Sequence, residues 1–354
     1  MDTLVIGGDE VRRLLPMAEC VDVMAQALGA LASADAMQPL RAVLRLPSGA
    51  GYLVVMPAYV GGALDAPGVK VITVFPGNFG SEIDSHQGAV LLFEGERGRL
   101  AAVIDASEVT AIRTAAVSGL ATRLLAREEA GDLALLGTGV QARSHLAAMA
   151  AVRRLRRVRV WSRDLARASA FAGRAAAEHP GCEISAAASA REAVSGADLV
   201  CTTTASNTPV LEGAWLAAGA HVNAVGACLP TARELDGAAV ARARTFVDRR
   251  ESALNEAGDL LLARAEGAIG DDHIAGEIGE LVIGAREGRR SPDEITLFKS
   301  LGLAIEDIAA AHYIHARARK EGAGAAIELG GSRDPAAQRT TETTTETTTE
   351  RTRR

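Results

Sequence analysis

The sequence predicts an α/β protein in which an α+β region is followed by a doubly wound parallel sheet. Two observations carry this prediction. From about residue 130 to 300, short apolar runs alternate with Ala-rich helical stretches, as in parallel strands joined by crossover helices. Residues 1 to about 120 instead combine helical stretches with several strand-like runs that Gly or Pro bounds. The chain has 354 residues, which is enough for two such domains.

The first region is expected to begin with a helix over 11–31. Strands are expected at five short apolar runs, 42–46, 51–57, 69–75, 90–93 and 100–104. The turn EGERG (94–98) joins the last two runs and predicts a hairpin. A long helix then runs from about 107 to 126, with Asp105 or Ser107 available as its N-cap. These elements form an N-terminal domain over residues 1–120.

The second region is assigned to residues 121–302. Its strands are expected at 133–136, 158–161, 199–203, 221–225 and 245–247. A last helical stretch is expected from 297 to about 327, and its part 303–328 is expected to pack back on the N-terminal domain. The tail 331–354 contains TTETTTETTTERTRR, which is of low complexity and almost without apolar residues, so we expect it to be disordered.

Composition narrows the classes of function. Hydrophobic content of 48% and charged content of 23% are typical of a soluble globular protein. A net charge of −6 without a basic patch argues against a nucleic-acid partner. The four cysteines stand far apart, so we expect no structural zinc and no disulfide framework. The two histidines His312 and His315 alone do not define a metal site, so we expect no other metal either. Without a signal-peptide pattern or an apolar run of roughly 18 residues, we expect a cytoplasmic protein with no membrane partner.

The run GTGVQA (137–142) carries the first chemical signal, because it follows the apolar strand DLALL and opens a helix. Gly137 permits a tight turn, Gly139 lets the backbone approach a pyrophosphate, and Ala142 allows close packing of helix and strand. The helix N-terminus offers free N–H groups to phosphates. This context predicts a Rossmann-type dinucleotide site that also involves Thr138, Val140 and Gln141. An ordinary glycine-rich turn is the alternative.

The end of the next strand is where the ribose of the cofactor is read. An NAD enzyme usually places Asp or Glu there, whereas this chain has Ser162 followed by Arg163. A hydroxyl beside a guanidinium suits a 2′-phosphate, so NADP(H) is favoured over NAD(H). The alternative is that Arg163 is a solvated charge and that Asp164 reads the ribose.

Further candidates for cofactor and substrate contact follow other predicted strands. Thr203 and Thr204 come after one strand, and Val225 and Cys228 lie at the end of the next. Ligands of open α/β sheets bind in the crevice at the carboxyl ends of the strands. Thr runs at strand ends are also common without function.

Three basic residues of the first region need a negatively charged group or solvent around them. Arg113 shares a helical stripe with the apolar Val117, Leu120 and Leu124. A charge there needs a structural carboxylate or an anionic ligand. Lys70 interrupts the apolar strand GVKVITVF, where alternation could also turn it to solvent. Arg41 follows Pro39 and could be a surface charge.

Nine stretches of the chain match one known family in combination. They are QPLR (38–41), GYLVVMPAY (51–59), GVKVITVFPGN (68–78), SHQGAVLLFE (85–94), VTAIRTAAVSGLAT (109–122), LLGTGVQARSH (135–145), VWSRD (160–164), HVNAVGACLPTARELD (221–236) and TLFKSLG (296–302). With them the sequence resembles the ornithine cyclodeaminase/mu-crystallin family over nearly everything except the tail. The resemblance implies a homodimer whose N-terminal domain binds substrate and dimerises. It further implies that Arg41, Lys70 and Arg113 surround a substrate carboxylate and that Lys299 approaches the cofactor.

One departure from the family pattern bears on the chemistry. Cyclodeaminating members carry an aspartate where this chain has Cys228, and mu-crystallin-like members also lack that aspartate. Oxidation of an amine needs a base that takes a proton from the substrate ammonium. Reduction of a protonated cyclic imine needs chiefly that the substrate is positioned and its charge is neutralised. Lys70, Arg113 and Cys228 are therefore the candidate catalytic residues, although for Cys228 a small apolar filler is the preferred interpretation. His86 either lines the substrate site or is a hydrogen-bonded structural histidine.

These observations predict an NAD(P)H-dependent reductase of a small cyclic imino acid. The substrate would be Δ1-pyrroline-2-carboxylate or Δ1-piperideine-2-carboxylate, and the product L-proline or L-pipecolate. Ornithine cyclodeaminase activity, alanine or other amino-acid dehydrogenase activity, and an NADPH-retaining ligand-binding protein with little turnover are the alternatives.

Overall fold

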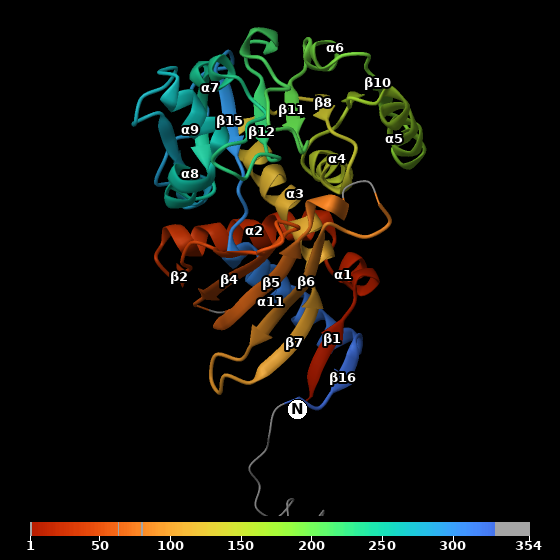
Figure 1. The fold of residues 1–354 in the computed structure, drawn as a ribbon, viewed down its shortest axis with the longest axis vertical. Coiled ribbons are helices and arrows are strands. Elements are labelled where there is room, and N and C mark those ends of the chain that lie inside the picture. The colour runs from red at the N-terminus through yellow and green to blue at the C-terminus, as the bar shows by residue number, and fades with distance from the viewer. Residues whose placement is uncertain (1, 63, 79–80, 330–354) are drawn as a thin grey trace, which may run out of the picture.

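The computed structural model describes residues 2–62, 64–78 and 81–329. The predicted disordered tail, 331–354, lies outside these residues. The described chain forms two eight-stranded sheets, one in each of two bodies that stack end to end (Figure 1). Among the described residues no single helix is long and apolar enough to cross a membrane, although two successive helices bent by 83° meet the length and composition together.

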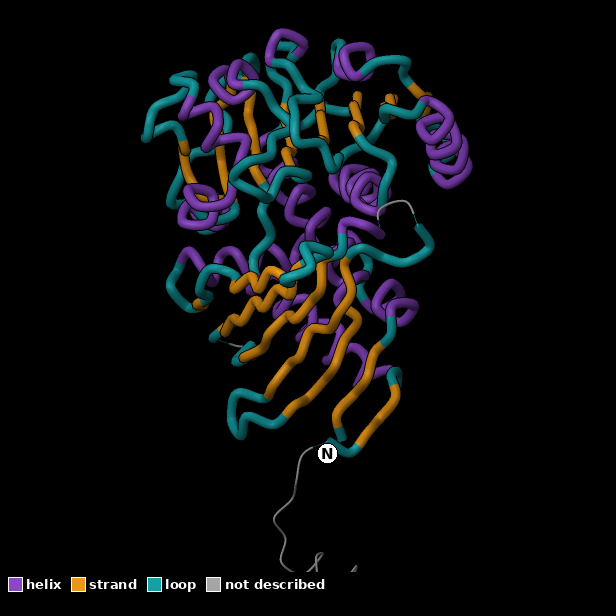
Figure 2. Tube along the Cα trace, viewed as in Figure 1, coloured by secondary structure: helices purple, strands orange, loops and turns teal. Residues whose placement is uncertain are grey.

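The first sheet is mainly antiparallel, with strand order β16-β1-β7-β6-β5-β4-β2 and with β3 paired to β4. Its strands are β1 (Thr3–Ile6), β2 (Ala36–Met37), β3 (Ala42–Arg45), β4 (Tyr52–Val60), β5 (Ala66–Val74), β6 (His86–Phe93), β7 (Leu100–Asp105) and β16 (Ala325–Ile327). Helix α11 (Ala304–Glu321) packs on β4, β5 and β6, and α1 (Gly8–Leu14) and α2 (Met17–Ala32) lie beside it. Helix α11 lies behind the sheet in Figures 1 and 2, whereas α1 and α2 lie at the edge of the sheet nearer the second body. The face toward the viewer carries no helix of the described chain.

The second sheet is parallel throughout, with strand order β10-β9-β8-β11-β12-β15-β13-β14. Its strands are β8 (Asp132–Leu136), β9 (Arg157–Trp161), β10 (Glu183–Ala186), β11 (Leu199–Thr202), β12 (His221–Ala224), β13 (Ala243–Val247), β14 (Ile274–Glu277) and β15 (Ile295–Lys299). The crossovers include α4 (Val140–Val152), α5 (Leu165–Glu178), α6 (Ala190–Val194), α7 (Gly237–Arg242), α8 (Arg250–Glu256), α9 (Gly258–Ala265) and α10 (Ile278–Val282). The strand order reverses between β8 and β11, which is where such a sheet binds its ligand.

Helix α3 (Ala106–Leu125) joins the two bodies and is capped as predicted, because the Asp105 carboxylate accepts the N–H of Glu108. It packs along α4 in parallel. The Ser118 hydroxyl lies 2.9 Å from Nε2 of His145, and one turn later the Thr122 hydroxyl lies 3.3 Å from the sulfur of Met149. Both pairs have the same sequence offset, so the two helices keep a constant register along their contact. The same offset places the middle of α3, around residues 110–113, beside the glycine turn that opens α4.

The expected α/β class and the expected strands of the second region are confirmed, whereas two helix predictions are wrong. The stretch 295–299 is strand β15 at the centre of the sheet, and the helix begins only at Ala304. A short apolar run buried on both faces cannot be assigned to strand or helix by periodicity, which explains the error. The helix expected over 11–31 is two helices separated at Pro16, because proline lacks the N–H that a continuous helix would use.

Candidate functional site

The glycine turn lies between β8 and α4, as the motif predicts. Gly137 has a φ of 130°, and a Cβ on it would approach within 2.5 Å of the Thr203 hydroxyl oxygen. A Cβ on Gly139 would meet nothing within 4 Å, so the backbone there is open to a ligand. No side chain caps α4, which leaves its first N–H groups, beginning at Val140, for an anion. Thr138 completes the turn, and these residues fit the pyrophosphate of a dinucleotide.

Two buried polar atoms on the paired helices have no hydrogen-bond partner among the described residues. They are the hydroxyl oxygen of Thr114, in the middle of α3, and the side-chain oxygen of Gln141, in the first turn of α4. Both residues lie one turn before the Ser118–His145 contact. Buried polar groups are normally satisfied, so these atoms mark a place where a bound molecule or a small rotation supplies the partner. Thr114 was not identified from the sequence.

The end of β9 presents Ser162 and Arg163 at the adjacent edge of the crevice. The Asp164 carboxylate accepts the N–H groups of Ala166 and Arg167 and so caps α5. The Ser162 hydroxyl bonds the backbone of Asp164, and Arg163 is exposed. Asp164 is engaged as a helix cap and Ser162 with the backbone of Asp164, so among these three residues Arg163 has the side chain left to meet the ribose.

The loops after β11 and β12 lie next to the glycine turn. The Thr203 hydroxyl donates to the carbonyl of Leu136 at 3.1 Å, so this loop is fastened to the end of β8. The Thr204 hydroxyl donates to a buried carboxylate of Glu234 at 2.7 Å. Val225 is buried and donates its N–H to the carbonyl of Thr202. The three strand ends form one edge, at the place where the topology predicts the ligand.

Cys228 and Lys299 have different surroundings from those of a crevice acid or base. Burial raises the pKa of the Cys228 thiol, which therefore stays neutral near pH 7. Its sulfur lies 3.5 Å from the carbonyl of Val225. Lys299 is completely buried, and its ammonium lies 2.9 Å from the Asp259 carboxylate. The structure thus gives Lys299 an internal ion pair instead of an open position at the cofactor crevice.

Lys70 and Arg113 meet in one buried cluster of charges. Lys70 Nζ lies 2.7 Å from Asp307, and Nε of Arg113 lies 2.8 Å from the other oxygen of the same carboxylate. Nη1 of Arg113 lies 2.8 Å from Glu306. Lys70 is only 1% exposed and Arg113 4%. Lys70 therefore faces the protein interior and not solvent, which strand alternation could not decide. The acids come from the first turn of α11, and sequence analysis missed them.

Burial sets the protonation of this cluster. It lowers the pKa of Lys70 to about 8, although Asp307 opposes the shift. It raises the pKa of Glu306 to about 7, although Arg113 opposes that shift. The Lys70 ammonium uses two of its three N–H groups, on Asp307 and on the Thr110 hydroxyl. Nη2 of Arg113 makes no hydrogen bond within the described ranges, so both cations retain donors.

Arg41 stands at the edge of this cluster, where the two bodies meet. Its Nη2 donates to the carbonyls of Leu301 and Gly302 at 2.9 and 3.0 Å. It also lies 3.0 Å from the Glu256 carboxylate of α8. The charge of Arg41 helps to lower the pKa of Lys70, so the two are electrostatically coupled. The three predicted cations are therefore gathered at the junction, each beside protein carboxylates.

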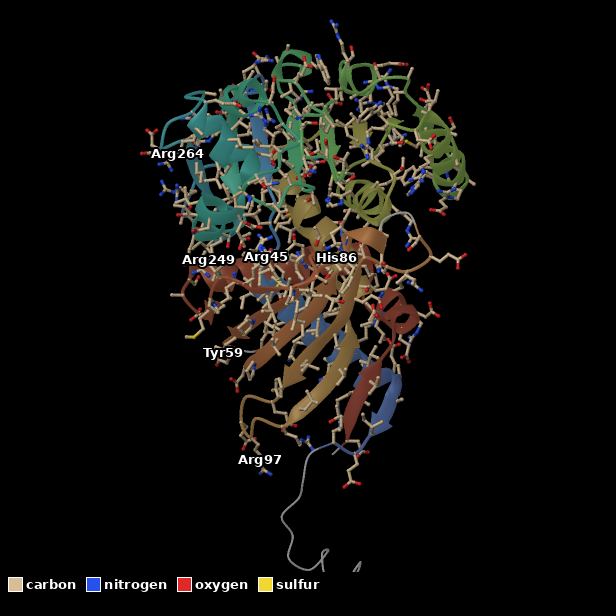
Figure 3. The ribbon with its side chains drawn as sticks, viewed as in Figure 1. Arg45, Tyr59, His86, Arg97, Arg249 and Arg264 are labelled. Atoms are coloured by element: carbon tan, nitrogen blue, oxygen red, sulfur yellow. The ribbon has the colours of Figure 1, made fainter. Side chains whose placement is uncertain are left out.

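His86 lies at the same junction, as Figure 3 shows. Its Nδ1 is 3.0 Å from the Ser85 hydroxyl. Burial lowers its pKa, with further lowering by Lys70 and Arg113, so the ring is neutral near pH 7. Both expectations for His86 remain compatible with this position, because it is hydrogen-bonded and also close to the cations.

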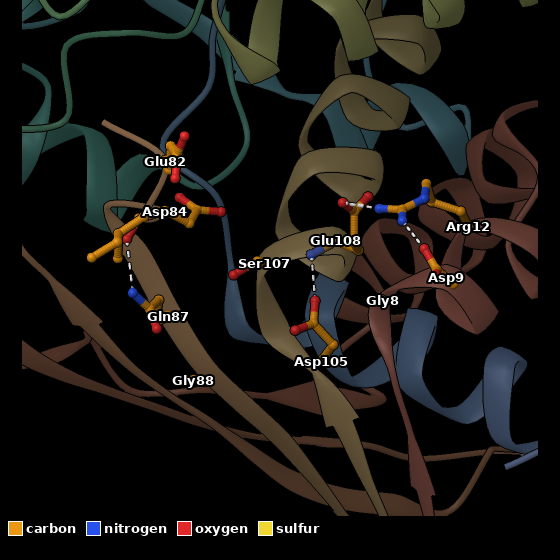
Figure 4. Close-up of a pocket in the computed structure, with 11 residues that line it drawn as sticks. Gly8, Asp9, Arg12, Glu82, Asp84, Gln87, Gly88, Asp105, Ser107 and Glu108 are labelled. Carbon is orange, nitrogen blue, oxygen red and sulfur yellow. Dashed lines mark hydrogen bonds and ion pairs between the residues drawn. The ribbon is translucent and has the colours of Figure 1, made fainter. Parts of the chain in front are cut away.

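A cavity of about 630 Å³ is lined by residues of the first body other than Arg41, Lys70 and Arg113 (Figure 4). Its charged lining is mostly acidic: Asp9, Glu82, Asp84, Asp105 and Glu108, with Arg12 as the basic member. Such a wall repels a carboxylate substrate. A much smaller cavity between Arg41, Met56 and Glu256 adjoins the cations. The chemistry of the cations, not the size of the larger cavity, marks the candidate site.

Comparison with known proteins gives the same assignment. The family model of the ornithine cyclodeaminase/mu-crystallin family matches residues 1–322. The ketimine reductase mu-crystallin of Mus musculus is 41% identical over 279 residues, covering 79% of this chain and 84% of the relative. A Delta(1)-pyrroline-2-carboxylate reductase of Bacillus cereus is 38% identical over 327 residues and covers 92% of this chain and 100% of the relative.

Solved structures agree with the sequence relatives. Thermococcus litoralis Delta(1)-pyrroline-2-carboxylate reductase, in complex with NADH and L-proline, superposes with a TM-score of 0.88 at 34% identity, covering 92% of this chain and all of that one. An archaeal alanine dehydrogenase dimer with bound NAD superposes with a TM-score of 0.87 at 32% identity, covering 93% of this chain and all of that one. The chain belongs to the ornithine cyclodeaminase/mu-crystallin family.

Proposed function

We propose that the protein uses NAD(P)H to reduce a cyclic imino acid, either Δ1-pyrroline-2-carboxylate to L-proline or Δ1-piperideine-2-carboxylate to L-pipecolate. The observation that carries the proposal is the buried pair Lys70 and Arg113 at the junction with a Rossmann-type crevice. The named activities of the mouse and Bacillus cereus relatives, and the NADH and L-proline bound by the Thermococcus litoralis protein, support it.

The cations would bind the substrate carboxylate through the donors that they do not use within the protein. These are Nη2 of Arg113, the third N–H of Lys70 and the remaining guanidinium N–H groups of Arg41. Because Lys70 and Arg113 are almost fully buried, the site must open locally to admit the substrate. A substrate held there would lie next to the strand ends of the nucleotide domain.

The site favours reduction over cyclodeamination. NAD(P)H, when bound, supplies the hydride for the carbon of the C=N bond. The substrate can enter as a protonated iminium, and the protein then needs to hold its carboxylate and to exclude water, with no internal base. Cyclodeamination must take a proton from the substrate ammonium, and a thiol whose pKa is raised by burial does not serve at Cys228.

NADP(H) is the proposed preference between the two cofactors. The Asp164 carboxylate that could bind a ribose 2′-hydroxyl instead caps α5. The exposed guanidinium of Arg163 next to the Ser162 hydroxyl suits a 2′-phosphate. NAD(H) is the alternative cofactor, and the Thermococcus litoralis relative binds NADH.

A homodimer is proposed from the uncovered face of the first sheet. In the strand register Val55 lies opposite Val71, and Val69 lies opposite Leu91, which lies opposite Val103. An antiparallel sheet that faces water normally alternates apolar with polar side chains, whereas this one is apolar on both faces. The dimer of the archaeal alanine dehydrogenase supports a second copy as the partner. Light scattering of Leu91→Arg against the parent protein tests it, and an unchanged mass would contradict it.

A spectrophotometric panel tests the catalytic proposal. Both cyclic imines should accelerate NADPH oxidation, and failure of both with either cofactor would overturn the proposal. Ammonia and proline from ornithine with catalytic NAD⁺ would indicate a cyclodeaminase. Net NAD⁺ reduction with alanine would indicate an amino-acid dehydrogenase, and tight NADPH binding without turnover a binding protein.

A further inference from the structure

One completely buried carboxylate, that of Glu234, holds both loops at the middle of the crevice. Its Oε1 accepts the N–H of Thr204 at 2.6 Å and the hydroxyl of the same residue at 2.7 Å. Its Oε2 accepts the N–H of Gly226 at 2.7 Å and the hydroxyl of Thr202 at 2.8 Å. Four donors from the ends of β11 and β12 therefore converge on one side chain.

The space around this carboxylate is fully used. A Cβ on Gly226 would lie 2.0 Å from the carbonyl oxygen of Thr204 and 2.7 Å from the carboxyl carbon of Glu234. The two loops consequently touch through backbone, and Glu234 sets their separation. Glycine is required at 226 by this close approach.

Glu234 is itself held from behind by a second buried acid. The Asp259 Oδ1 atom accepts the N–H of Glu234 at 2.7 Å and that of Leu235 at 3.0 Å. Its Oδ2 atom lies 2.9 Å from Nζ of Lys299 on β15. Glu234, Asp259 and Lys299 are each completely buried. The support thus extends across three neighbouring strands, and Lys299 neutralises its acidic centre.

The division of donors between the two oxygens requires a carboxylate. One oxygen faces the backbone N–H of Thr204 and the other faces that of Gly226, and neither N–H can turn away. A glutamine has one oxygen and one NH₂ group, so either of its orientations sets a donor against a backbone donor. The cost of such an unsatisfied buried group is what makes the site selective for glutamate.

We infer that Glu234 is a positioning residue that sets the nicotinamide half of the cofactor site. In a doubly wound sheet each half binds one mononucleotide, so β8, β9 and β10 receive the adenosine half and β11 and β12 receive the other. Glu234 contacts only the second half. The inference rests on the proposed use of NAD(P)H, because it assigns a role within that site.

The test compares the binding of whole and half cofactor by calorimetry on the full chain. Glu234→Gln is expected to weaken NADPH binding by about tenfold or more, while 2′,5′-ADP, which carries only the adenosine half, binds as before. The matched control is Glu266→Gln, at a half-exposed acid that pairs with Arg233. Equal weakening of both ligands, or no change in either, would overturn the inference. Parent protein that binds no NADPH would instead overturn the proposed function.

A second pair of variants decides the matter if Glu234→Gln does not fold. The Thr202 hydroxyl is completely buried and donates to Glu234, so it cannot touch a cofactor. The isosteric Thr202→Val removes this donor and should weaken NADPH but not 2′,5′-ADP, whereas Thr202→Ser should restore binding. Identical NADPH affinities for the valine and serine variants would count against the inference.

Discussion

Replacing Lys70 by methionine should abolish most activity without destabilising the fold. Burial lowers the pKa of Lys70 from 10.5 to about 8, so at neutral pH the charged form is about 3 kcal/mol less favourable in the folded than in the unfolded chain. Against this gain, an oxygen of Asp307 loses its partner, which costs about 1–3 kcal/mol. Asp307 keeps Nε of Arg113 at 2.8 Å. The gain equals or exceeds this cost, so the free energy of unfolding should lie between that of the parent and about 2 kcal/mol above it.

Asp307, the acid that pairs with Lys70, provides a variant with the opposite expected effect on stability. Asp307→Asn leaves two buried cations without their shared carboxylate and should cost about 3–5 kcal/mol. Chemical denaturation at pH 7 measures both variants, and imine-dependent NADPH oxidation measures catalysis. A loss of about 3 kcal/mol or more in Lys70→Met would refute the reasoning, because the lysine would then be a net stabiliser. Retained kcat/KM would refute its place at the substrate carboxylate.

Three further predictions concern protonation and cofactor choice. Burial raises the pKa of Glu306 from 4.5 to about 7, so its stabilising contribution is full below about pH 4.5 and is lost as pH rises through 7. Between about pH 5 and 8 the free energy of unfolding of the parent should fall by up to about 3 kcal/mol, and that of Glu306→Gln should not. Superimposable Tm–pH profiles of the two proteins would contradict this. Cys228→Ala should reduce kcat/KM by far less than the ~10²-fold that a general acid or base contributes, and a larger loss with a changed pH–rate profile would assign the thiol a catalytic role. Arg163→Ala should raise KM for NADPH about 10–100-fold and leave KM for NADH unchanged; equal effects would indicate that NAD(P) preference is set elsewhere.

The nucleotide half of the fold was predictable because its signals are local. The strand DLALL, the GTG turn and the helix that follows occupy successive positions, and the structure places them as the motif requires. Strand β15 was not predictable in this way. Its five residues are all buried, so neither a period of two nor one of about 3.6 is visible, and only its partners β12 and β13 identify it as a strand.

The substrate half depended on contacts between residues far apart in the chain. Alternation could not decide whether Lys70 faces solvent, because its side of the sheet is covered by α11, which lies more than 200 residues later. The acids Glu306 and Asp307 carried a usable signal, since they interrupt the apolar run AIEDIAAA just as Arg113 interrupts its own helix. A pair of misplaced charges of opposite sign in two apolar helices predicts that they meet.

Gly302 lies in the segment that crosses between the two bodies, next to the cation Arg113. Replacing it tests whether backbone strain and displacement of Arg113 have separate effects. Gly302 has a φ of 78°, its N–H is held by Asp248, and a Cβ on it would lie 2.4 Å from Nη1 of Arg113. Gly302→Ala should therefore cost about 1–3 kcal/mol through backbone strain and, by displacing Arg113, raise KM for the imine about 10–100-fold. Gly284→Ala is the matched control, because Gly284 has a φ of 72° and nothing within 4 Å of such a Cβ. It should lose similar stability and keep its KM, and equal KM values for the two variants would show that Arg113 does not depend on the space at Gly302.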